Sequence, residues 1–406
     1  MTVSLPWGAW YLNTRCELAL PDSWAVDEYK GPEGMADLRG HARQACQKPL
    51  SSPRLRDLAA NRNKVMIAID DTTRPTPTGP ILSEVLDELA LAGVDDTQVT
   101  VIVASGGHRP PTRRDMVLKL GEALLQRIRL IYHHAHEGLV YLGKTSYGTP
   151  VYTNRLFQQA DLKIGIGSIT PHDFAGFGGG GKIVAIGLAG IETLHHDHML
   201  QAEHFRRSVA NIEQNDCQAD IRQIANMVGL DFLVNAVPSQ DLQPLQIVGG
   251  AYTAVHAHCA ELMRSAWEVT LRQPTYDVAF LNAYPKDNDL IQSYMALNVC
   301  LFPCVEMLKE SGIAVLTTPA PDGAATHSLG GFGCRGYEIP AAAILKGRRL
   351  AVFSPCLNPY DTDGYFPAGT ISFHSREQML SFLIEELPGQ RQAAVFHNAS
   401  LQWLAE

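Results

Sequence analysis

Short apolar runs alternate with longer amphipathic stretches along the first two-thirds of the chain. Runs rich in β-branched residues predict strands at 64–70, 99–105, 129–134 and 161–168. Apolar residues spaced near the helical period predict helices at 79–92, 116–128, 216–229 and 252–271. Strands that alternate with helices are typical of a mostly parallel sheet covered on both faces.

The alternation is interrupted near residue 272 and then begins again. Pro274 breaks the preceding helical pattern. Beyond it the pattern predicts strands at 277–283, 312–318 and 349–354, and a helix at 290–299. A chain of 406 residues is also too long for one ordinary core. We therefore predict two α/β domains with mostly parallel sheets, 1–272 and 273–406, and a long functional loop in the glycine-rich stretch 321–336.

Charge and composition exclude several classes of protein. The net charge is −9 and no run of Lys or Arg occurs, so we expect no nucleic-acid partner. The N-terminus lacks the basic and apolar regions of a signal peptide. We expect no apolar segment to reach the roughly 18 residues of a membrane span, and hence no membrane partner. The 8 cysteines form no C-x-x-C pair, which is typical of reduced thiols in a cytoplasmic protein.

Titratable side chains follow three of the predicted strands. In an open α/β sheet, ligands bind beyond the carboxyl ends of the strands, so these side chains are candidates for one active site. They are Asp70, Asp71 and Arg74 after the first strand, His108 and Arg109 after the second, and His172 and Lys182 after the fourth.

Each of these features also has a purely structural interpretation. Asp and Thr before Pro75 are ordinary helix-capping residues. A single histidine such as His108 is more often a hydrogen-bonded structural residue than a catalyst. Four glycines can simply make a loop flexible. The convergence of three loops, and no single residue, favours an active site.

The four glycines before Lys182 favour an anion-binding turn. Backbone N–H groups in such a turn form a nest for phosphate. The segment from Gly176 to Lys182 satisfies G-x-x-x-x-G-K, but Ile183 stands where a P-loop needs a hydroxyl for magnesium. The lead from the preceding strand is also too long for that motif. A P-loop nucleotide hydrolase is therefore the least favoured interpretation.

Three histidines follow the turn, His195, His196 and His198. Imidazole binds zinc, nickel and copper, although a solvated helix face explains such a cluster equally well. No H-E-x-x-H motif is present, and the histidines at 133–136 lack ligand spacing. A site built from several protein ligands is unsupported, whereas one histidine completing a metallocofactor is compatible with the pattern.

From about residue 60 to 300 the chain resembles the nickel-dependent lactate racemase family. The resemblance is carried by DDTTRP, ASGGHRP, LGKTSYGTPVYTN and PHDFAGFGGGGK, followed by His198. The family has two α/β domains, with the active site in the cleft between them. Its cofactor is a nickel-pincer nucleotide, a pyridinium mononucleotide joined to a lysine through a thioamide.

The resemblance implies a role for each matching residue. Lys182 would be the covalent attachment point, His198 the nickel ligand, and His108 and His172 the acid–base pair. The remaining matches would bind cofactor or substrate: Asp71, Arg74, Gly178, Gly179, Gly180 and Gly181 the cofactor, and Arg74 and Gln292 the substrate.

The implied reaction is inversion of C2 of a small α-hydroxy acid by a racemase or epimerase. One histidine takes the hydroxyl proton while hydride passes to the cofactor, and hydride then returns to the other face of the ketone. The other implied partners are the enzymes that make and load the cofactor. The alternative is a non-catalytic relative that binds the cofactor or a small acid.

The chain departs from the family at two positions beside Gln292. Ile291 and Met295 stand where members typically have Tyr and Lys. Lys286 and Arg335 are candidates to replace the missing cation. The loss favours an acid larger or more apolar than lactate.

Overall fold

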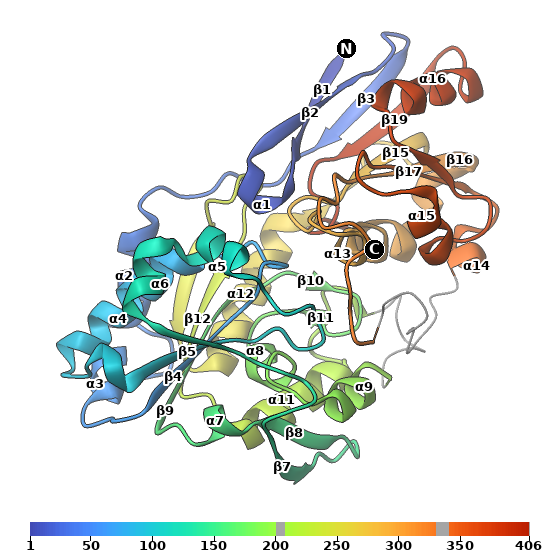
Figure 1. Cartoon of the computed structure of the whole chain (residues 1–406). Helices are drawn as coiled ribbons and strands as arrows, with labels where there is room; N and C mark the ends of the chain where they lie inside the picture. Colours follow the sequence, from blue (N-terminus) through green and yellow to red (C-terminus); the bar gives the residue numbers. More distant parts are fainter. Residues whose placement is uncertain (200–207, 330–340, 406) are drawn as a thin grey trace.

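Two six-stranded sheets form the framework of the computed structural model, which describes residues 1–199, 208–329 and 341–405 (Figure 1). The first sheet has the order β13-β12-β9-β4-β5-β6, and only the β12–β13 pair is antiparallel. Its strands are β4 (Val65–Ile69), β5 (Val99–Val103), β6 (Arg129–Tyr132), β9 (Leu162–Ser168), β12 (Phe232–Val237) and β13 (Gln246–Gly250).

The second sheet is parallel throughout, with the order β18-β17-β16-β15-β19-β3. Its strands are β3 (Trp24–Tyr29), β15 (Tyr276–Asn282), β16 (Leu308–Thr317), β17 (Arg349–Phe353), β18 (Ile371–Phe373) and β19 (Arg391–Phe396). The predicted class, α/β with mostly parallel sheets, is confirmed. Short pairs complete the strands: β1 (Thr2–Trp7) with β2 (Thr14–Ala19), β7 (Leu139–Lys144) with β8 (Pro150–Asn154), β10 (Pro171–His172) with β11 (Gly176–Phe177), and β14 (Glu268–Val269) with β20 (Trp403–Leu404).

Sheet membership departs from the predicted domain limits at the N-terminus. Strand β3 pairs with β19, so residues 24–29 belong to the second sheet although the sequence analysis assigned 1–272 to one domain. The second sheet otherwise begins with β15, close to the predicted boundary at 272. The limits of independently folding domains stay a prediction.

Helices cover both faces of the first sheet. Helices α2, α3 and α4 pack on one face, where they share a core with β4, β5, β9 and β12. Helices α8, α11 and α12 lie on the other side. The helices are α1 (Ala9–Leu12), α2 (Leu38–Gln47), α3 (Leu55–Ala59), α4 (Thr78–Leu91), α5 (Arg113–Leu120), α6 (Glu122–Arg127), α7 (Arg155–Gln158), α8 (Lys182–Ala185), α9 (Ile191–Met199), α11 (Asp216–Val228), α12 (Tyr252–Trp267), α13 (Leu290–Ser293), α14 (Ala341–Leu345), α15 (Pro359–Tyr365) and α16 (Arg376–Glu386). Short 3-10 or π segments are η1 (Asp96–Gln98), η2 (Leu297–Leu301) and η3 (Phe302–Met307).

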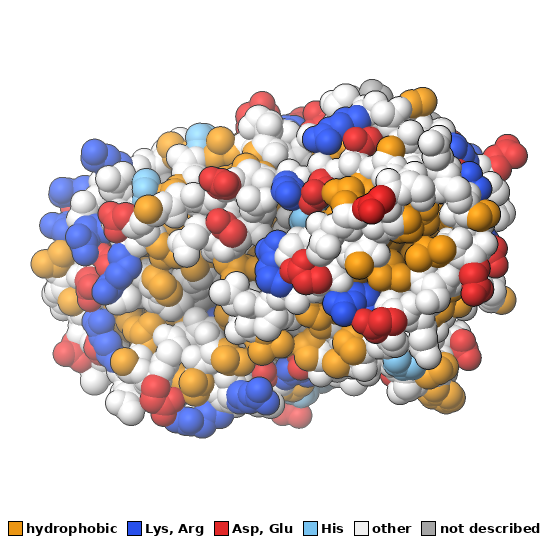
Figure 2. Space-filling model, turned by 90° about the horizontal axis from the view of Figure 1, so that it is seen from above, with side chains coloured by type: hydrophobic (Ala, Val, Ile, Leu, Met, Phe, Trp, Pro, Cys, Tyr) orange, Lys and Arg blue, Asp and Glu red, His pale blue; other side chains and the backbone are white. Residues whose placement is uncertain are grey.

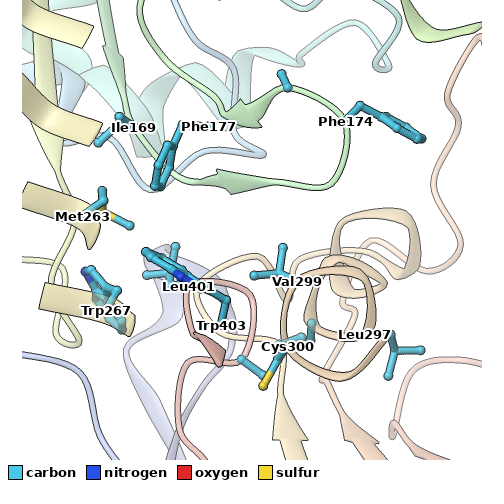
Figure 3. Close-up of a cluster of buried hydrophobic side chains, with 14 of the residues drawn as sticks. Ile169, Phe174, Phe177, Met263, Trp267, Leu297, Val299, Cys300, Leu401 and Trp403 are labelled. Atoms are coloured by element: carbon cyan, nitrogen blue, oxygen red, sulfur yellow. The ribbon is translucent and has the colours of Figure 1, made fainter. Parts of the chain in front are cut away.

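One apolar cluster joins the two sheets. Figure 3 shows Phe177 and Ile169, which follow β9, beside Met263 and Trp267 of α12 and Trp403 near the C-terminus. The rings of Phe177 and Trp403 meet edge to face, with their centroids 5.7 Å apart. The outer face of the second sheet has its own core beneath β1, β2 and α16. The joint between the sheets is therefore a continuous hydrophobic core.

The register of the strands brings the predicted site residues to one edge. Ile69 of β4 pairs with Val103 of β5 and with Ile166 of β9. The three loops that follow these strands therefore leave the sheet side by side, as the sequence analysis expected for an open α/β sheet.

Two predicted helices are broken in the structure. The helix expected at 116–128 divides into α5 and α6 at Gly121, which has φ +81°. The helix expected at 290–299 is α13 followed by η2, a π-helical segment. All residues of this π-helical segment, Leu297–Leu301, are buried.

The expectation that no apolar segment reaches membrane-spanning length was wrong. Leu290–Met307 has 18 residues and a mean hydropathy of 1.3. It is 67% buried within the protein, as the core helix of a soluble protein also is. On the face shown in Figure 2, basic and acidic side chains are interspersed.

We predict that Trp403→Ala lowers the free energy of unfolding by about 3 to 5 kcal/mol, because it leaves a cavity where the two sheets join. Denaturant unfolding measures the loss. Leu91→Ala is the control, since Leu91 is 66% exposed and its truncation leaves no cavity. Equal stability of the two variants would contradict a core that joins the sheets.

Candidate active site

A cavity of about 420 Å³ lies where the loops of the two sheets meet. It is lined by most of the residues that the sequence analysis selected: Asp71, Arg74, His108, His172, Gly178, Gly179, Lys182, His198 and Gln292. Gly180 and Gly181 lie behind this lining. Arg109 is bound elsewhere, in ion pairs with Asp115 and Asp322. Asp70 lines the cavity but is paired with the buried Lys119 at 2.8 Å.

His108 is held by a buried carboxylate. Its Nδ1 lies 2.7 Å from Asp71 Oδ2, while Thr73 donates its backbone N–H to Asp71 Oδ1 at 2.9 Å. Burial raises the pKa of the Asp71 carboxyl, but His108, Arg74 and Thr73 outweigh it and hold that pKa well below its usual range. Asp71 is therefore ionised and fixes the orientation of the imidazole.

Arg74 connects this group to the second sheet. Its Nη1 donates to Gln292 Oε1 at 2.9 Å and to Thr73 Oγ1 at 2.8 Å. Gln292 lies in α13, whose N-cap Asp289 accepts the Gln292 backbone N–H. Gln292 Nε2 is 3.5 Å from His108 Nε2. One polar cluster thus includes residues from both sheets.

His172 lies between a carboxylate and the lysine of the glycine turn. Its Nδ1 is 3.0 Å from Asp173 Oδ1 and accepts the backbone N–H groups of Phe174 and Ala175 at 3.2 and 3.3 Å. Its Nε2 is 2.7 Å from Lys182 Nζ. Asp173 also accepts from Asn298 Nδ2 at 2.6 Å. Burial, with the Lys182 charge beside it, lowers the pKa of His172 to about 3, and burial also lowers the pKa of Lys182. Imidazole and carboxylate thus form a second close pair, but Nδ1 of His172 accepts backbone N–H groups whereas Nδ1 of His108 bonds to its carboxylate.

The glycine turn packs so closely that side chains are excluded from it. Gly179 and Gly180 have φ of +75° and +58°. A Cβ on Gly179 would lie 2.6 Å from Asn235 Nδ2, and one on Gly180 would lie 2.6 Å from the His256 ring. Only glycine meets both conditions.

Two polar atoms beside the turn have no hydrogen-bond partner among the described residues. They are Ser168 Oγ, at the end of β9, and Asn235 Nδ2, in β12. Both residues line the cavity and are buried. Because a buried polar atom without a partner is costly, these two atoms indicate where a polar ligand can bind.

His198 has a different environment from His195 and His196, the other two histidines of α9. Its Nδ1 donates to the backbone oxygen of Leu194 at 2.8 Å, which leaves Nε2 available as a ligand atom. Burial, with the Lys182 charge nearby, lowers the pKa of His198 to about 4, so the ring is neutral. His195 is exposed, and His196 bonds to Thr149. Among the described residues no group of three His, Cys, Asp or Glu side chains could hold a metal ion.

Four further residues line the cavity that were not placed there from the sequence: Asp173, Asn298, Lys286 and His327. The His327 ring lies 5.1 Å from that of His108, and burial lowers its pKa to about 2. Lys286 was only a candidate, and its position after a strand of the second sheet was the available signal. Arg335, the other candidate cation, lies outside the described residues, as do residues 330–336 of the predicted loop.

These features define a two-sheet α/β protein with a cavity lined by two histidine–carboxylate pairs and two lysines. Residues 11–209 match the family described as the lactate racemase N-terminal domain. The chain is 26% identical over 295 residues to the lactate racemase of Thermoanaerobacterium thermosaccharolyticum, covering 71% of this chain and 67% of that protein. It is also 26% identical over 292 residues to the lactate racemase of Lactiplantibacillus plantarum, with the same coverage of 71% and 67%.

Solved structures give the same assignment of fold. The lactate racemase apoprotein of Thermoanaerobacterium thermosaccharolyticum superposes with a TM-score of 0.77 at 20% identity, covering 100% of both chains. A protein of Thermotoga maritima gives a TM-score of 0.66 at 14% identity, covering 93% of this chain and 100% of the other. The match over residues 11–209 and the two relatives support membership of the lactate racemase family, while the solved structures show the fold alone.

We predict that the apoprotein loses stability between pH 6.5 and pH 5 through His172. The pKa of His172 is about 3 in the folded protein, against about 6.5 in an unfolded chain, so only the unfolded state gains the proton in this range. The contribution is present above pH 6.5 and is lost as the pH falls, by about 2 kcal/mol at pH 5.

Denaturant unfolding at the two pH values measures this loss. His172→Asn should show a smaller loss than the wild type, while His195→Asn, which changes an exposed ring, should not. An unchanged pH dependence in His172→Asn would contradict a neutral, buried His172.

Proposed function

We propose that the protein is a racemase, or epimerase, that inverts C2 of an α-hydroxy acid with a nickel-pincer nucleotide attached at Lys182. Its homologues indicate an isomerase of the racemase type. The observation that carries the proposal is the presence of two histidine–carboxylate pairs, His108–Asp71 and His172–Asp173, in one cavity. Inversion needs an acid–base group for each direction, and two matched histidines supply them.

Each histidine can exchange the hydroxyl proton of the substrate at Nε2. Asp71 holds Nδ1 of His108, and the backbone N–H groups of Phe174 and Ala175 hold Nδ1 of His172, so Nε2 is the nitrogen left to act on a ligand. In this structure His172 Nε2 is engaged by Lys182. Conversion of the Lys182 amine into a thioamide would remove its positive charge and release His172 Nε2. Attachment at Lys182 would thus free one of the two acid–base groups.

The residues present fit the proposed cofactor. Ser168 Oγ and Asn235 Nδ2 are buried donors without partners, beside a turn that has room only for glycine, and they suit the phosphate of a mononucleotide. His198, neutral and with Nε2 available, suits a single nickel bond. Asp71 and Arg74 would lie near the cofactor. The bound cofactor would supply a hydride acceptor and donor.

The cavity wall favours a substrate with an apolar side chain. Ile291 and Met295 line it together with Leu329 and Phe366. A methyl group would leave much of this surface in contact with water, whereas a branched or aromatic side chain would bury it. We therefore propose 2-hydroxy-4-methylpentanoate or 3-phenyllactate as better substrates than lactate, with Gln292 and Arg74 binding the polar end.

Two alternative functions predict different experimental results from the proposed racemase. A non-catalytic relative would bind the cofactor or an acid without racemisation, and the altered positions 291 and 295 are what favour it. A P-loop hydrolase requires magnesium-dependent ATP binding, which Ile183 disfavours. A cytoplasmic location and the absence of nucleic-acid and membrane partners stay predictions.

Chiral chromatography of single enantiomers, incubated with protein co-produced with the cofactor-making enzymes, tests the proposal. We expect racemisation of the apolar α-hydroxy acids at higher kcat/KM than of lactate. His108→Asn and His172→Asn should each lower kcat by about 10²- to 10⁴-fold, because each removes an acid–base group. His195→Asn is the matched control on α9.

Lys182→Ala separates the proposal from the binding alternative. If the proposal is right, Lys182→Ala loses both bound nickel and racemisation. If the protein only binds the cofactor, the variant loses binding, and no racemisation is seen even in the wild type. A loaded wild-type protein that racemises none of these acids would contradict the proposed activity.

A further inference from the structure

The buried side chain of Lys286 lines the cavity and has no carboxylate partner among the described residues. Its side chain is 1% exposed, and it forms no ion pair with a carboxylate of the described residues. Its Nζ is 3.5 Å from the backbone oxygen of Pro171, a weak contact. A buried lysine without a counter-ion is costly, which calls for a ligand that compensates it.

We propose that Lys286 binds the carboxylate of the substrate, in the role that the missing cation at position 295 would otherwise have. This inference rests on the proposed function and extends it to a residue for substrate recognition. Lys286 would form the charge-assisted bond from the side of the second sheet, and Arg74 would stand on the other side of the polar cluster.

The backbone around Lys286 is fixed by several hydrogen bonds. The loop follows β15, and the Lys286 N–H donates to Ala283 O at 2.9 Å. Asp287 accepts the Gly8 N–H through its side chain at 3.1 Å, and its backbone oxygen accepts from Ala320 at 3.1 Å. A flexible side chain is thus carried by a rigid loop, which is favourable for positioning a ligand.

The charged groups around Lys286 are more often cationic than anionic. Arg74 and Lys182 repel its ammonium, and with burial they lower its pKa well below the usual range. Asp173 is the only acidic group among these influences, and it is already engaged by His172 and Asn298. A carboxylate entering the cavity would raise the pKa of Lys286 and so favour its ammonium form.

The position of Lys286 favours the substrate over the cofactor phosphate. Pro171, which Nζ contacts, directly precedes His172, the proposed acid–base residue. The donors suited to phosphate, Ser168 and Asn235, come instead from strands of the first sheet. Lys286 therefore lies beside the reacting centre of the proposed substrate.

The test compares Lys286→Met with wild type in the cofactor-loaded protein, using 2-hydroxy-4-methylpentanoate. We expect KM to rise by about 10- to 100-fold, the usual value of a hydrogen bond to a charged group, with nickel content and mass adduct unchanged. Lys163→Met is the matched control. Its side chain is partly buried and donates to a backbone oxygen, that of Val228, but it lies outside the cavity.

Two measurements do not depend on turnover. Calorimetry with the apoprotein should show weaker binding of 2-hydroxy-4-methylpentanoate to Lys286→Met, but equal binding of the corresponding amide, which has no charge. The melting temperature of Lys286→Met should equal or exceed that of wild type, since the variant removes an unpaired buried charge. A purely structural lysine would lower it.

Moving the cation completes the test. Met295→Lys in the Lys286→Met background should restore a low KM, because residue 295 lines the same cavity. An unchanged KM and unchanged acid binding in Lys286→Met would overturn the inference while racemisation stands. Loss of nickel or of the adduct would also overturn it, in favour of a role toward the cofactor. A wild-type protein that binds the acid through Lys286 without racemising it would overturn only the proposed function.

Discussion

The close packing of one glycine turn determines the geometry of the whole site. Gly179 and Gly180 adopt positive φ, and each lies where a Cβ would collide with Asn235 or His256. This packing presses the chain against the ends of β9 and β12, and it directs Lys182 back toward His172 at 2.7 Å. Any larger residue would separate these two side chains. The contact between Lys182 and His172 therefore depends on glycine at positions 179 and 180.

Around this turn the protein buries an unusual number of ionisable groups, and it satisfies most of them in pairs. Lys119 neutralises Asp70, His108 accompanies Asp71, and His172 accompanies Asp173. The unsatisfied groups are more informative. Ser168 Oγ and Asn235 Nδ2 lack hydrogen-bond partners, and Lys286 lacks a counter-ion, among the described residues. Since such groups reduce stability, a ligand in this cavity that carries phosphate and carboxylate oxygens would satisfy these three side chains.

The sequence predicted what depends on local pattern. Strands such as 64–70 and 161–168, and the convergence of His108, His172 and Lys182, followed from periodicity and from the rule for parallel sheets. The pairing of β3 with β19 joins residues more than 360 positions apart, and nothing in the local pattern specifies such a partner. The irregular winding after α13 likewise depends on packing between the sheets. Asp173 and Asn298 were missed because their role comes only from contacts with each other and with His172.

Attachment of the cofactor at Lys182 is the central claim, and the intact mass of the protein tests it most directly. The protein should be co-produced with the cofactor-making enzymes, and nickel should be measured in the same sample. The account predicts a mass adduct that maps to Lys182 and about one nickel per chain. An unmodified, nickel-free chain from cells in which a known lactate racemase becomes loaded would contradict it.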